Sequence, residues 1–350
     1  MTQCHESRMM KALRREATDC TPIWMMRQAG RYMAEYRGVR AKTSFLELCA
    51  NPELAAEVML TAVEKLGVDA AIIFSDLLVI LQEMGMDLEF AKGEGPILHN
   101  AILDASGIDR LRELENPQAL GYVYQTVAKT RSGLQPELPL IGFAGAPFTL
   151  ASYAIEGGAS RNYLRTKTLM YTDAGAWDTL MSRLARAVAA YLIEQIHAGA
   201  DILQIFDSWV GCLGVSDYRT FVRPYSQKVI DCVKAVSPET PIIHFTTGNP
   251  QLLPEVRAAG GDCIGVDWRI ELDTAWKILG YDRAIQGNLD PVVLLTEPHI
   301  IHTHAQRLLR QAAGRPGHIF NLGHGILPET PVENVVELVK QVHDYTASDV

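Results

Sequence analysis

The stretch Pro22-Ile23-Trp24-Met25-Met26-Arg27-Gln28-Ala29-Gly30-Arg31 contains the unit from which the fold is predicted. It begins as a short apolar run typical of a buried strand, and it ends in arginines separated by a flexible turn. Arginine stays protonated at any working pH and presents a planar fork of donors to carboxylates and phosphates. The stretch therefore predicts a strand with an anion-binding loop at its carboxyl end. The alternative is a structural loop in which Arg31 and Arg37 pair with the acidic neighbours Glu35 and Glu47.

The same unit recurs along the chain, as short apolar runs separated by helical patterns. Asn51-Pro52-Glu53 supplies a helix cap and a first-turn proline, and residues 179–198 show apolar side chains at helical spacing. Eight such runs alternating with helices in 350 residues predict an α/β fold, a (β/α)8 TIM barrel forming a single domain over residues 1–350. A doubly wound open sheet is the alternative. The runs are 23–26, 70–74, 140–143, 202–206, 242–245, 263–266, 284–286 and 318–321.

Composition and charge exclude several classes of protein. The net charge of -9 and the pI near 5.6 argue against nucleic acid as a partner, because nucleic-acid binding needs a basic footprint. No apolar stretch is long enough to span a membrane, and the polar start of the chain does not resemble a signal peptide. The six cysteines are scattered without paired spacing, which is typical of reduced thiols. We expect a cytoplasmic protein with neither nucleic acid nor membrane as partner.

Polar residues follow nearly every apolar run. In a (β/α)8 barrel the active site lies at the carboxyl ends of the strands, so these positions are the candidates for chemistry. They are Arg27 and Arg31, Ser75 and Asp76, Gly145 and Ala146, Asp207 and Ser208, residues 246–249, Asp267, residues 287–290, and His324 between Gly323 and Gly325.

Two long motifs carry a family resemblance. The opening stretch is similar to the pattern P-x-W-x-M-R-Q-A-G-R of the uroporphyrinogen decarboxylase family. The segment Gly142-Phe143-Ala144-Gly145-Ala146-Pro147-Phe148-Thr149-Leu150, followed by Tyr153 and Glu156-Gly157, resembles that family's other fingerprint. Chance agreement of two such long patterns in order is far rarer than that of a short glycine motif. Shorter matches are Ile73-Phe74-Ser75-Asp76, Phe206-Asp207-Ser208-Trp209, Gln286-Gly287-Asn288-Leu289-Asp290 and Asn321-Leu322-Gly323-His324-Gly325.

The resemblance implies a carboxy-lyase of porphyrin and haem biosynthesis. Such an enzyme converts the acetate side chains of uroporphyrinogen III to methyl groups and gives coproporphyrinogen III and carbon dioxide. It also implies that no cofactor and no metal are used, because a pyrrole protonated on a ring carbon can accept the electron pair that most decarboxylases pass to a cofactor. A homodimer is implied as well.

The resemblance also implies roles for particular residues. Asp76 would face the pyrrole N–H groups and stabilise the transient positive charge. Arg27 is one candidate proton donor, although removing a guanidinium proton near pH 7 costs roughly 7 kcal/mol; water relayed through Tyr153 or His324 is another. The catalytic residues implied are Asp76, Arg27, Tyr153 and His324. The substrate-binding residues implied are Arg27, Gln28, Ala29, Gly30, Arg31, Asp76, Tyr153, Ser208 and His324.

Simpler roles remain open for these side chains when the residues are considered alone. Asp76 and Ser208 would serve as helix caps, Tyr153 as helix core and His324 as a turn residue. One departure from the family pattern is Ala34, where the family commonly has proline, and it leaves the rigidity of the arginine loop open.

Two alternative functions remain. Related barrels are zinc-dependent methyltransferases, which need a His-x-Cys element near this point of the chain, whereas the sequence reads His244-Phe245-Thr246. We therefore expect His244 to lie in the core. The second alternative is a porphyrinogen carrier without turnover, and the joint presence of Arg27, Asp76 and the other implied catalytic residues favours an enzyme.

Overall fold

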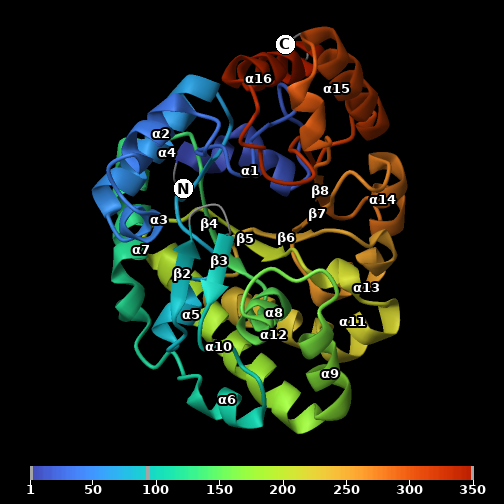
Figure 1. Ribbon diagram of the computed structural model, residues 1–350. Helices are drawn as coiled ribbons and strands as arrows, with labels where there is room; N and C mark the ends of the chain where they lie inside the picture. The colour runs from blue at the N-terminus through green and yellow to red at the C-terminus, as the bar shows by residue number, and fades with distance from the viewer. Residues whose placement is uncertain (1–2, 92–94, 348–350) are drawn as a thin grey trace.

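Short apolar strands form a parallel sheet that curls around the centre of the molecule, and helices cover its outside (Figure 1). The computed structural model describes residues 3–91 and 95–347. Within them the sheet has seven strands in the order β1-β4-β5-β6-β7-β8-β9, all parallel to their neighbours. The strands are β1 (Ala71–Ile72), β4 (Leu140–Gly145), β5 (Ile202–Asp207), β6 (Ile242–Thr246), β7 (Cys263–Gly265), β8 (Ala284–Gln286) and β9 (His318–Ile319).

The strand order distinguishes the two predicted architectures. A doubly wound sheet reverses its strand order at a switch point, whereas here each strand pairs with the next strand of the sheet in chain order. The predicted (β/α)8 barrel is confirmed and the open sheet is wrong. Seven of the eight predicted runs contain a strand, and the exception is the run at 23–26.

The run at 23–26 closes the ring as an extended segment rather than as a regular strand. Ile23 forms a parallel bridge with Phe320, next to β9, and its carbonyl accepts a hydrogen bond from the Asp69 N–H at 2.8 Å. Backbone N–H groups that a regular strand would donate to the neighbouring strand donate here to side-chain oxygens. The Ile23 N–H donates to Asp69 Oδ2 at 2.7 Å, the Met25 N–H to Gln28 Oε1 at 3.2 Å, and the Met26 N–H to Asn321 Oδ1 at 3.1 Å. The segment therefore occupies the eighth barrel position without a ladder.

A polar ladder of side chains crosses the barrel interior. Trp24 Nε1 donates to Gln286 Oε1 at 2.9 Å, and Gln286 Nε2 donates to Gln204 Oε1 at 3.1 Å. These side chains are almost completely inaccessible to solvent. Because buried polar groups are costly unless they are hydrogen-bonded, this ladder fixes the closing segment against β8 and β5.

The helices begin and end where local sequence signals place them. Asn51 caps α4, accepting a hydrogen bond from the Leu54 N–H, and Gly67 ends the helix in the left-handed conformation. The long helix predicted over 179–198 begins earlier, at Ala174, because Asp173 caps it. The helices are α1 (Arg8–Leu13), α2 (Ala34–Arg40), α3 (Phe45–Cys49), α4 (Pro52–Leu66), α5 (Val79–Glu83), α6 (Ala105–Arg110), α7 (Gly121–Gly133), α8 (Pro147–Glu156), α9 (Leu164–Thr172), α10 (Ala174–His197), α11 (Val215–Phe221), α12 (Arg223–Val236), α13 (Leu253–Ala259), α14 (Leu272–Leu279), α15 (Pro298–Ala312) and α16 (Val332–Thr346).

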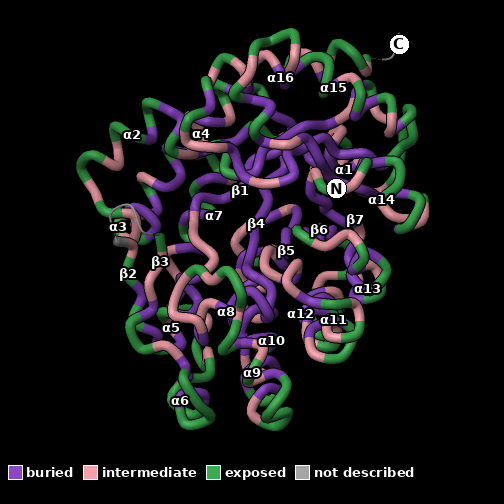
Figure 2. The backbone as a smooth tube through the Cα atoms, turned by 45° about the vertical axis from the view of Figure 1, so that its right-hand side comes forward, coloured by how far each residue is buried: buried purple, intermediate pink, exposed green. Residues whose placement is uncertain are grey.

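Burial follows the barrel architecture. The strands and the inward faces of the helices are buried, and the outward faces are exposed (Figure 2). An antiparallel hairpin of β2 (Leu88–Ala91) and β3 (Gly95–Leu98) lies outside the barrel, next to α5. In the part of the chain that is described, no helix is both long and apolar enough to cross a membrane.

Asp69 ties the closing segment to both ends of the chain. Besides the Ile23 N–H, its carboxylate accepts hydrogen bonds from Arg8 of α1 at 2.9 Å and lies 2.8 Å from His343 Nε2 of α16. The residue is 8% exposed. Removing it would leave several buried or half-buried donors without an acceptor, which costs more than an exposed ion pair contributes.

We expect Asp69→Ala to lower the free energy of unfolding by about 3 kcal/mol, measured by urea denaturation. The matched control is Asp282→Ala, which breaks an exposed pair with Arg257 and is expected to cost less than about 1 kcal/mol. Equal losses in the two variants would show that Asp69 has no special part in closing the barrel.

Candidate active site

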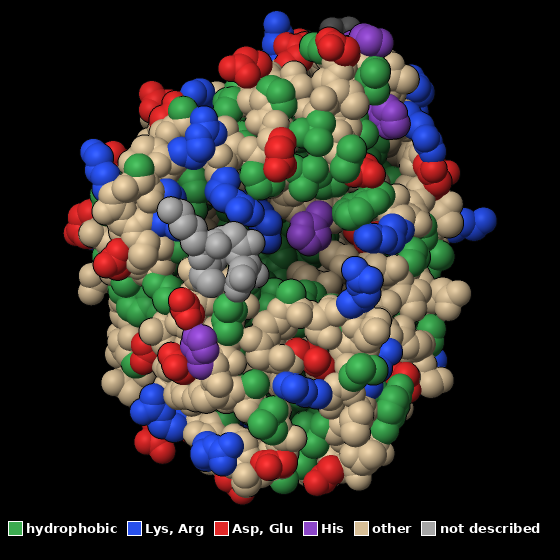
Figure 3. Space-filling model, viewed as in Figure 1, with side chains coloured by type: hydrophobic (Ala, Val, Ile, Leu, Met, Phe, Trp, Pro, Cys, Tyr) green, Lys and Arg blue, Asp and Glu red, His purple; other side chains and the backbone are tan. Residues whose placement is uncertain are grey.

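The carboxyl ends of the barrel strands bring together side chains from distant parts of the chain. Asp76 follows β1, Ser208 follows β5, Tyr153 lies on α8 after β4, and His324 lies on the loop after β9. Arg27 comes from the closing segment. Figure 3 shows a hollow near the middle of one face of the molecule, with Lys and Arg side chains on two sides and a His at its rim.

Asp76 is a half-buried carboxyl group with one built-in hydrogen-bond donor. Its Oδ1 accepts a hydrogen bond from the Leu78 N–H at 2.9 Å, while no described residue donates to Oδ2. Burial raises the pKa of Asp76 from 3.8 to about 6, and the Leu78 N–H and the Arg27 charge only partly oppose that rise. The cap position of α5 is held by Leu78, without a side-chain cap, so the helix-cap role expected as the alternative for Asp76 is wrong, and its second carboxylate oxygen is left for a ligand.

Arg27 adopts a left-handed backbone conformation, with φ of 62°, which is costly for a residue with a side chain. The strain is held by the Met26 residue before it, whose N–H donates to Asn321 and whose carbonyl accepts from the Ile326 N–H at 3.0 Å. A Cβ atom at Gly325 would collide with Cδ of Arg27. Glycine is therefore required at 325 for the Arg27 side chain to lie across the loop after β9.

The loop after Arg27 does not form the structural ion pairs that were the alternative. Glu35 pairs with Lys65 at 2.6 Å, and Glu47 instead caps α3 by accepting a hydrogen bond from the Ser44 N–H at 2.7 Å. Arg31 is exposed at the surface. The alternative of a purely structural loop is wrong for these pairs.

Arg37 supplies the rigidity that a proline at position 34 would otherwise give. Its Nη1 donates to the backbone carbonyls of Arg31 at 2.9 Å and Tyr32 at 2.7 Å. Gly30 is needed in the same turn, because a Cβ there would lie 2.9 Å from the Arg27 carbonyl oxygen. Charge-assisted hydrogen bonds to the backbone thus hold the turn in one shape.

Gln28 faces the core rather than the hollow. Its Nε2 donates to the Ala70 carbonyl at 3.1 Å, and its Oε1 accepts from the Met25 N–H. The side chain is completely buried and joins the closing segment to the residue before β1. The predicted binding stretch from Gln28 to Arg31 therefore offers the backbone N–H groups of Ala29, Gly30 and Arg31 and the side chain of Arg31, because the Gln28 N–H donates to the Met25 carbonyl.

The Tyr153 ring packs against Trp209, a residue that lies within a sequence motif but had no assigned role. Its ring centroid lies 3.7 Å from that of Trp209, with the planes 32° apart. Burial, and then the negative charge of Asp76, raise the pKa of Tyr153 to about 12, which Arg27 opposes. The hydroxyl is therefore close enough to Asp76 and Arg27 to be influenced by both charges, and it keeps its proton near neutral pH.

Ser208 lies half-buried beside the same aromatic pair. Its carbonyl accepts a hydrogen bond from Thr247 Oγ1 at 2.9 Å. The short 3-10 helix Val210–Cys212 that follows has Trp209 at its cap position and no side-chain cap. Ser208 is thus not a helix cap, and its hydroxyl is left for another partner.

His324 is fixed between two close backbone approaches. Gly323 packs against Trp268, where a Cβ would lie 2.6 Å from the Trp268 nitrogen, and Gly325 packs against Arg27. Burial and the nearby charges of Arg27 and Arg269 lower the pKa of His324 to about 4, although Asp267 opposes this. The imidazole is therefore neutral near pH 7.

A second set of polar side chains lies deeper, below the site. His244 is completely buried, as expected, and its Nε2 lies 3.6 Å from Asp207 Oδ2. Tyr218 donates a long hydrogen bond of 3.4 Å to the same carboxylate. Over residues 3–91 and 95–347, no group of three or more His, Cys, Asp or Glu side chains is arranged to hold a metal ion.

Comparison with known proteins places this arrangement in a family. The family model described as "Uroporphyrinogen decarboxylase (URO-D)" matches residues 5–345. The chain belongs to the uroporphyrinogen decarboxylase family. Among its relatives, the uroporphyrinogen decarboxylase of Koribacter versatilis is 52% identical over 338 residues, covering 97% of this chain and 96% of that protein. The uroporphyrinogen decarboxylase of Carboxydothermus hydrogenoformans is 49% identical over 338 residues, with the same coverage of 97% and 96%.

Solved structures extend the comparison at the level of the fold. A methyltransferase from Methanosarcina mazei superposes with a TM-score of 0.79 at 20% identity, covering 99% of both chains. A putative vitamin-B12 independent methionine synthase from Listeria monocytogenes has a TM-score of 0.53 at 11% identity, covering 96% of this chain and 98% of that one. This chain thus shares its fold with proteins whose names give other activities.

The raised pKa of Asp76 predicts a pH-dependent stability effect. The folded-state pKa, about 6, lies above the unfolded value of 3.8, so wild type loses stability as the pH rises between them. Asp76→Asn does not titrate, and we expect it to be more stable than wild type by about 2–3 kcal/mol at pH 7.5, with no difference below about pH 4. Urea denaturation across this pH range measures it. A gain that is absent at pH 7.5, or undiminished at pH 3.5, would contradict the burial of this carboxyl group.

Proposed function

We propose that this chain decarboxylates the acetate side chains of uroporphyrinogen III, giving coproporphyrinogen III and carbon dioxide without a cofactor. The observation that carries the proposal is the single carboxyl group of Asp76, raised in pKa and left with one oxygen available beside Arg27 and Tyr153. Membership of the family and the names of its relatives support the same reaction. The substrate carries eight carboxylates around a ring of pyrrole N–H donors, and the site offers cations around one carboxylate.

Binding would centre the macrocycle on Asp76. A carboxylate accepts several hydrogen bonds, so the pyrrole N–H groups supply the partners that Asp76 Oδ2 lacks among the described residues. Arg27 and Arg31 are exposed and would bind carboxylates at the rim. The backbone N–H groups of Ala29, Gly30 and Arg31 meet no described acceptor, and such a run of N–H groups in a turn attracts anions. An acidic protein can therefore bind an acidic substrate through a local field.

The chemistry needs a place for the electron pair of the broken C–C bond. Protonation of a ring carbon next to the acetate makes the pyrrole an iminium-like cation, which accepts that pair as carbon dioxide leaves. Protonation of the resulting methylene and loss of the ring proton restore the pyrrole and complete a methyl group. Each acetate thus exchanges carbon dioxide for one proton. The Asp76 carboxylate, held by Leu78 and partly shielded from water, would stabilise the cation electrostatically.

The pKa values favour Asp76 as the proton donor as well. Taking the proton from Tyr153, whose pKa is about 12, costs about 7 kcal/mol near pH 7, and protonating His324, whose pKa is about 4, costs about 4 kcal/mol. Asp76, at about 6, lies nearest the working pH. Hydrogen bonds from the pyrrole N–H groups favour the ionised carboxylate, so transfer of the proton to the ring carbon would leave Asp76 as the anion that stabilises the cation. Tyr153 and neutral His324 would then bind and orient carboxylates.

A homodimer and a cytoplasmic location belong to the proposal. The homodimer is supported by the family resemblance. The location is supported by free thiols at Cys20, Cys49 and Cys263 in the interior, and at Cys232 on the surface. An exposed thiol persists in a reducing compartment.

The test is anaerobic incubation of metal-stripped protein with uroporphyrinogen III, following loss of carboxylates by chromatography. We expect wild type to convert it stepwise to coproporphyrinogen III. Asp76→Asn should lower the rate by at least about 100-fold, because it loses both the proton and the charge. The matched control, Asp282→Asn, changes an exposed aspartate that pairs with Arg257 and should leave the rate unchanged. Tight binding by wild type without release of carbon dioxide would contradict the enzyme and favour a carrier.

A further inference from the structure

A second arginine lies on the side of His324 opposite Arg27. It follows a strand end at which the sequence motifs assign no role to an arginine. Arg269 follows β7, two residues after Asp267. The loop carrying His324 passes between the two arginines, because Gly323 packs on the backbone of Trp268 and Gly325 packs on Arg27. The site therefore has a guanidinium on each side of one neutral imidazole.

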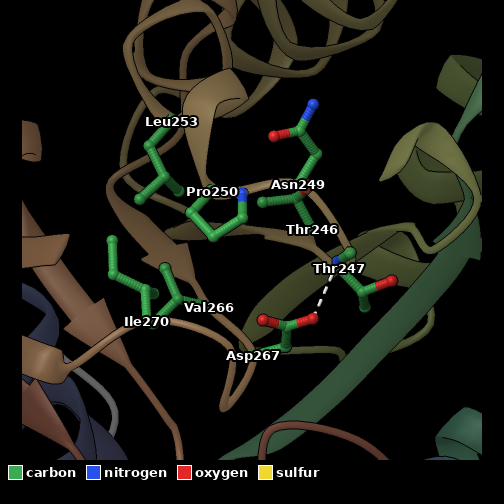
Figure 4. Close-up of a pocket in the computed structure, with 9 residues that line it drawn as sticks. Thr246, Thr247, Asn249, Pro250, Leu253, Val266, Asp267 and Ile270 are labelled. Carbon is green, nitrogen blue, oxygen red and sulfur yellow. Dashed lines mark hydrogen bonds between the residues drawn. The ribbon is translucent and has the colours of Figure 1, made fainter. Parts of the chain in front are cut away.

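Asp267 holds the turn that carries Arg269. Its carboxylate is 4% exposed and accepts hydrogen bonds from the Arg269 N–H at 3.0 Å and from Arg269 Nη1 at 2.5 Å. The Gly248 N–H donates to it at 2.7 Å, joining the ends of β6 and β7 (Figure 4). Asn288 Nδ2 donates to the carbonyls of Asp267 at 2.7 Å and Ile270 at 2.8 Å. The turn is thus tied to the loops on both sides of it.

The guanidinium of Arg269 is also held from one face. Its Cζ lies 4.3 Å from the ring centroid of Trp268, a distance at which a cation is attracted to the ring. The side chain is nevertheless 46% exposed. Nη1 binds Asp267, while Nε and Nη2 have no acceptor among the described residues. An arginine held on one edge and on one face is ordered before a ligand arrives, so binding costs little side-chain entropy.

The charges of Arg269 and Asp267 do not cancel at the position where a ligand would bind. Two backbone N–H groups, those of Gly248 and Arg269, share the buried carboxylate with the guanidinium. At His324 the Arg269 charge lowers the pKa more than the Asp267 charge raises it. Because the carboxylate is buried while the guanidinium is 46% exposed, the positive end of the pair lies on the open side, as an anion-binding group requires.

We propose that Arg269 binds a carboxylate of the porphyrinogen on the side of the site opposite Arg27, and that Asp267 is its positioning residue. This inference rests on the proposed function. A cation that holds the carboxylate of a reacting acetate would stabilise the ground state and oppose loss of carbon dioxide. The carboxylate bound by Arg269 is therefore that of a propionate, which persists through every step and remains in the product.

The test compares Arg269→Gln with wild type in two measurements. Anaerobic kinetics give kcat and KM for uroporphyrinogen III, and anaerobic titration gives Kd for coproporphyrinogen III, which carries propionates but no acetates. Losing one charged bidentate contact should raise both KM and Kd about tenfold, with kcat within about twofold of wild type. Arg307→Gln is the matched control, because Arg307 is an exposed arginine paired with Glu271, and neither constant should change.

Asp267→Asn tests positioning through the same constants. As a single substitution, Asp267→Asn should raise KM and Kd and leave kcat unchanged. Combined with Arg269→Gln, it should raise KM and Kd little further, because both substitutions remove the same interaction. Additive losses in the double variant, or a fall in kcat without a change in KM, would indicate a structural role for Asp267 and overturn this part.

The Kd and KM of Arg269→Gln and the activity of wild type separate the inference about Arg269 from the proposed function. An unchanged Kd for coproporphyrinogen in Arg269→Gln overturns the inference, and a KM that still rises would assign the contact to an acetate instead. Failure of the wild-type protein to release carbon dioxide would overturn the proposed function, and Kd would then still report whether Arg269 binds a propionate.

Discussion

Closure of the barrel by residues 22–26 is the constraint on which the site depends. The segment has too few ladder hydrogen bonds to count as a strand, and three side chains bind its backbone instead: Asp69, Gln28 and Asn321. Asp69 also receives Arg8 from α1 and lies against His343 of α16, so both ends of the chain contribute to closure. This is a costly arrangement to assemble and a rigid one once formed. It places the next residue, Arg27, in a conformation that an unrestrained loop would avoid.

The second constraint is electrostatic. The fold gives the Asp76 carboxylate little stabilisation by hydrogen bonds or ion pairs. A buried carboxylate is usually stabilised by an ion pair or by several donors, and then its pKa falls. Over residues 3–91 and 95–347, one N–H, that of Leu78, donates a hydrogen bond to this carboxylate, and burial outweighs its effect on the pKa. The folded chain thus keeps an incompletely satisfied acceptor at the mouth of a barrel, at a cost in stability. A ring of pyrrole N–H groups matches what is missing, which links the stability of the free protein to the chemistry proposed for the complex.

Much of the architecture follows from sequence patterns alone. Apolar runs separated by helical segments predicted the barrel, and long motifs brought Asp76, Arg27, Tyr153, Ser208 and His324 into one family pattern. The barrel prediction is confirmed, and it puts these side chains near one another because strand ends in a parallel barrel meet at one face, whatever lies between them in the chain.

What the sequence could not supply was which atoms each side chain faces. Gln28 lies in a binding motif but turns into the core, since the backbone of the closing segment needs its amide. Arg37 looked like a partner for surface acids, and it braces the turn through carbonyl groups. Arg269 carries no motif, and only the packing of Gly323 on Trp268 shows that it lies beside His324. Such roles depend on contacts between loops that no local pattern records.

The most direct test of the central claim is a crystal structure of the protein with coproporphyrinogen III bound under anaerobic conditions. The account predicts pyrrole nitrogens within about 3 Å of the Asp76 carboxylate oxygens, with propionates directed towards the arginines at the rim. A macrocycle bound with its nitrogens turned away from Asp76, or bound outside the carboxyl ends of the strands, would contradict it.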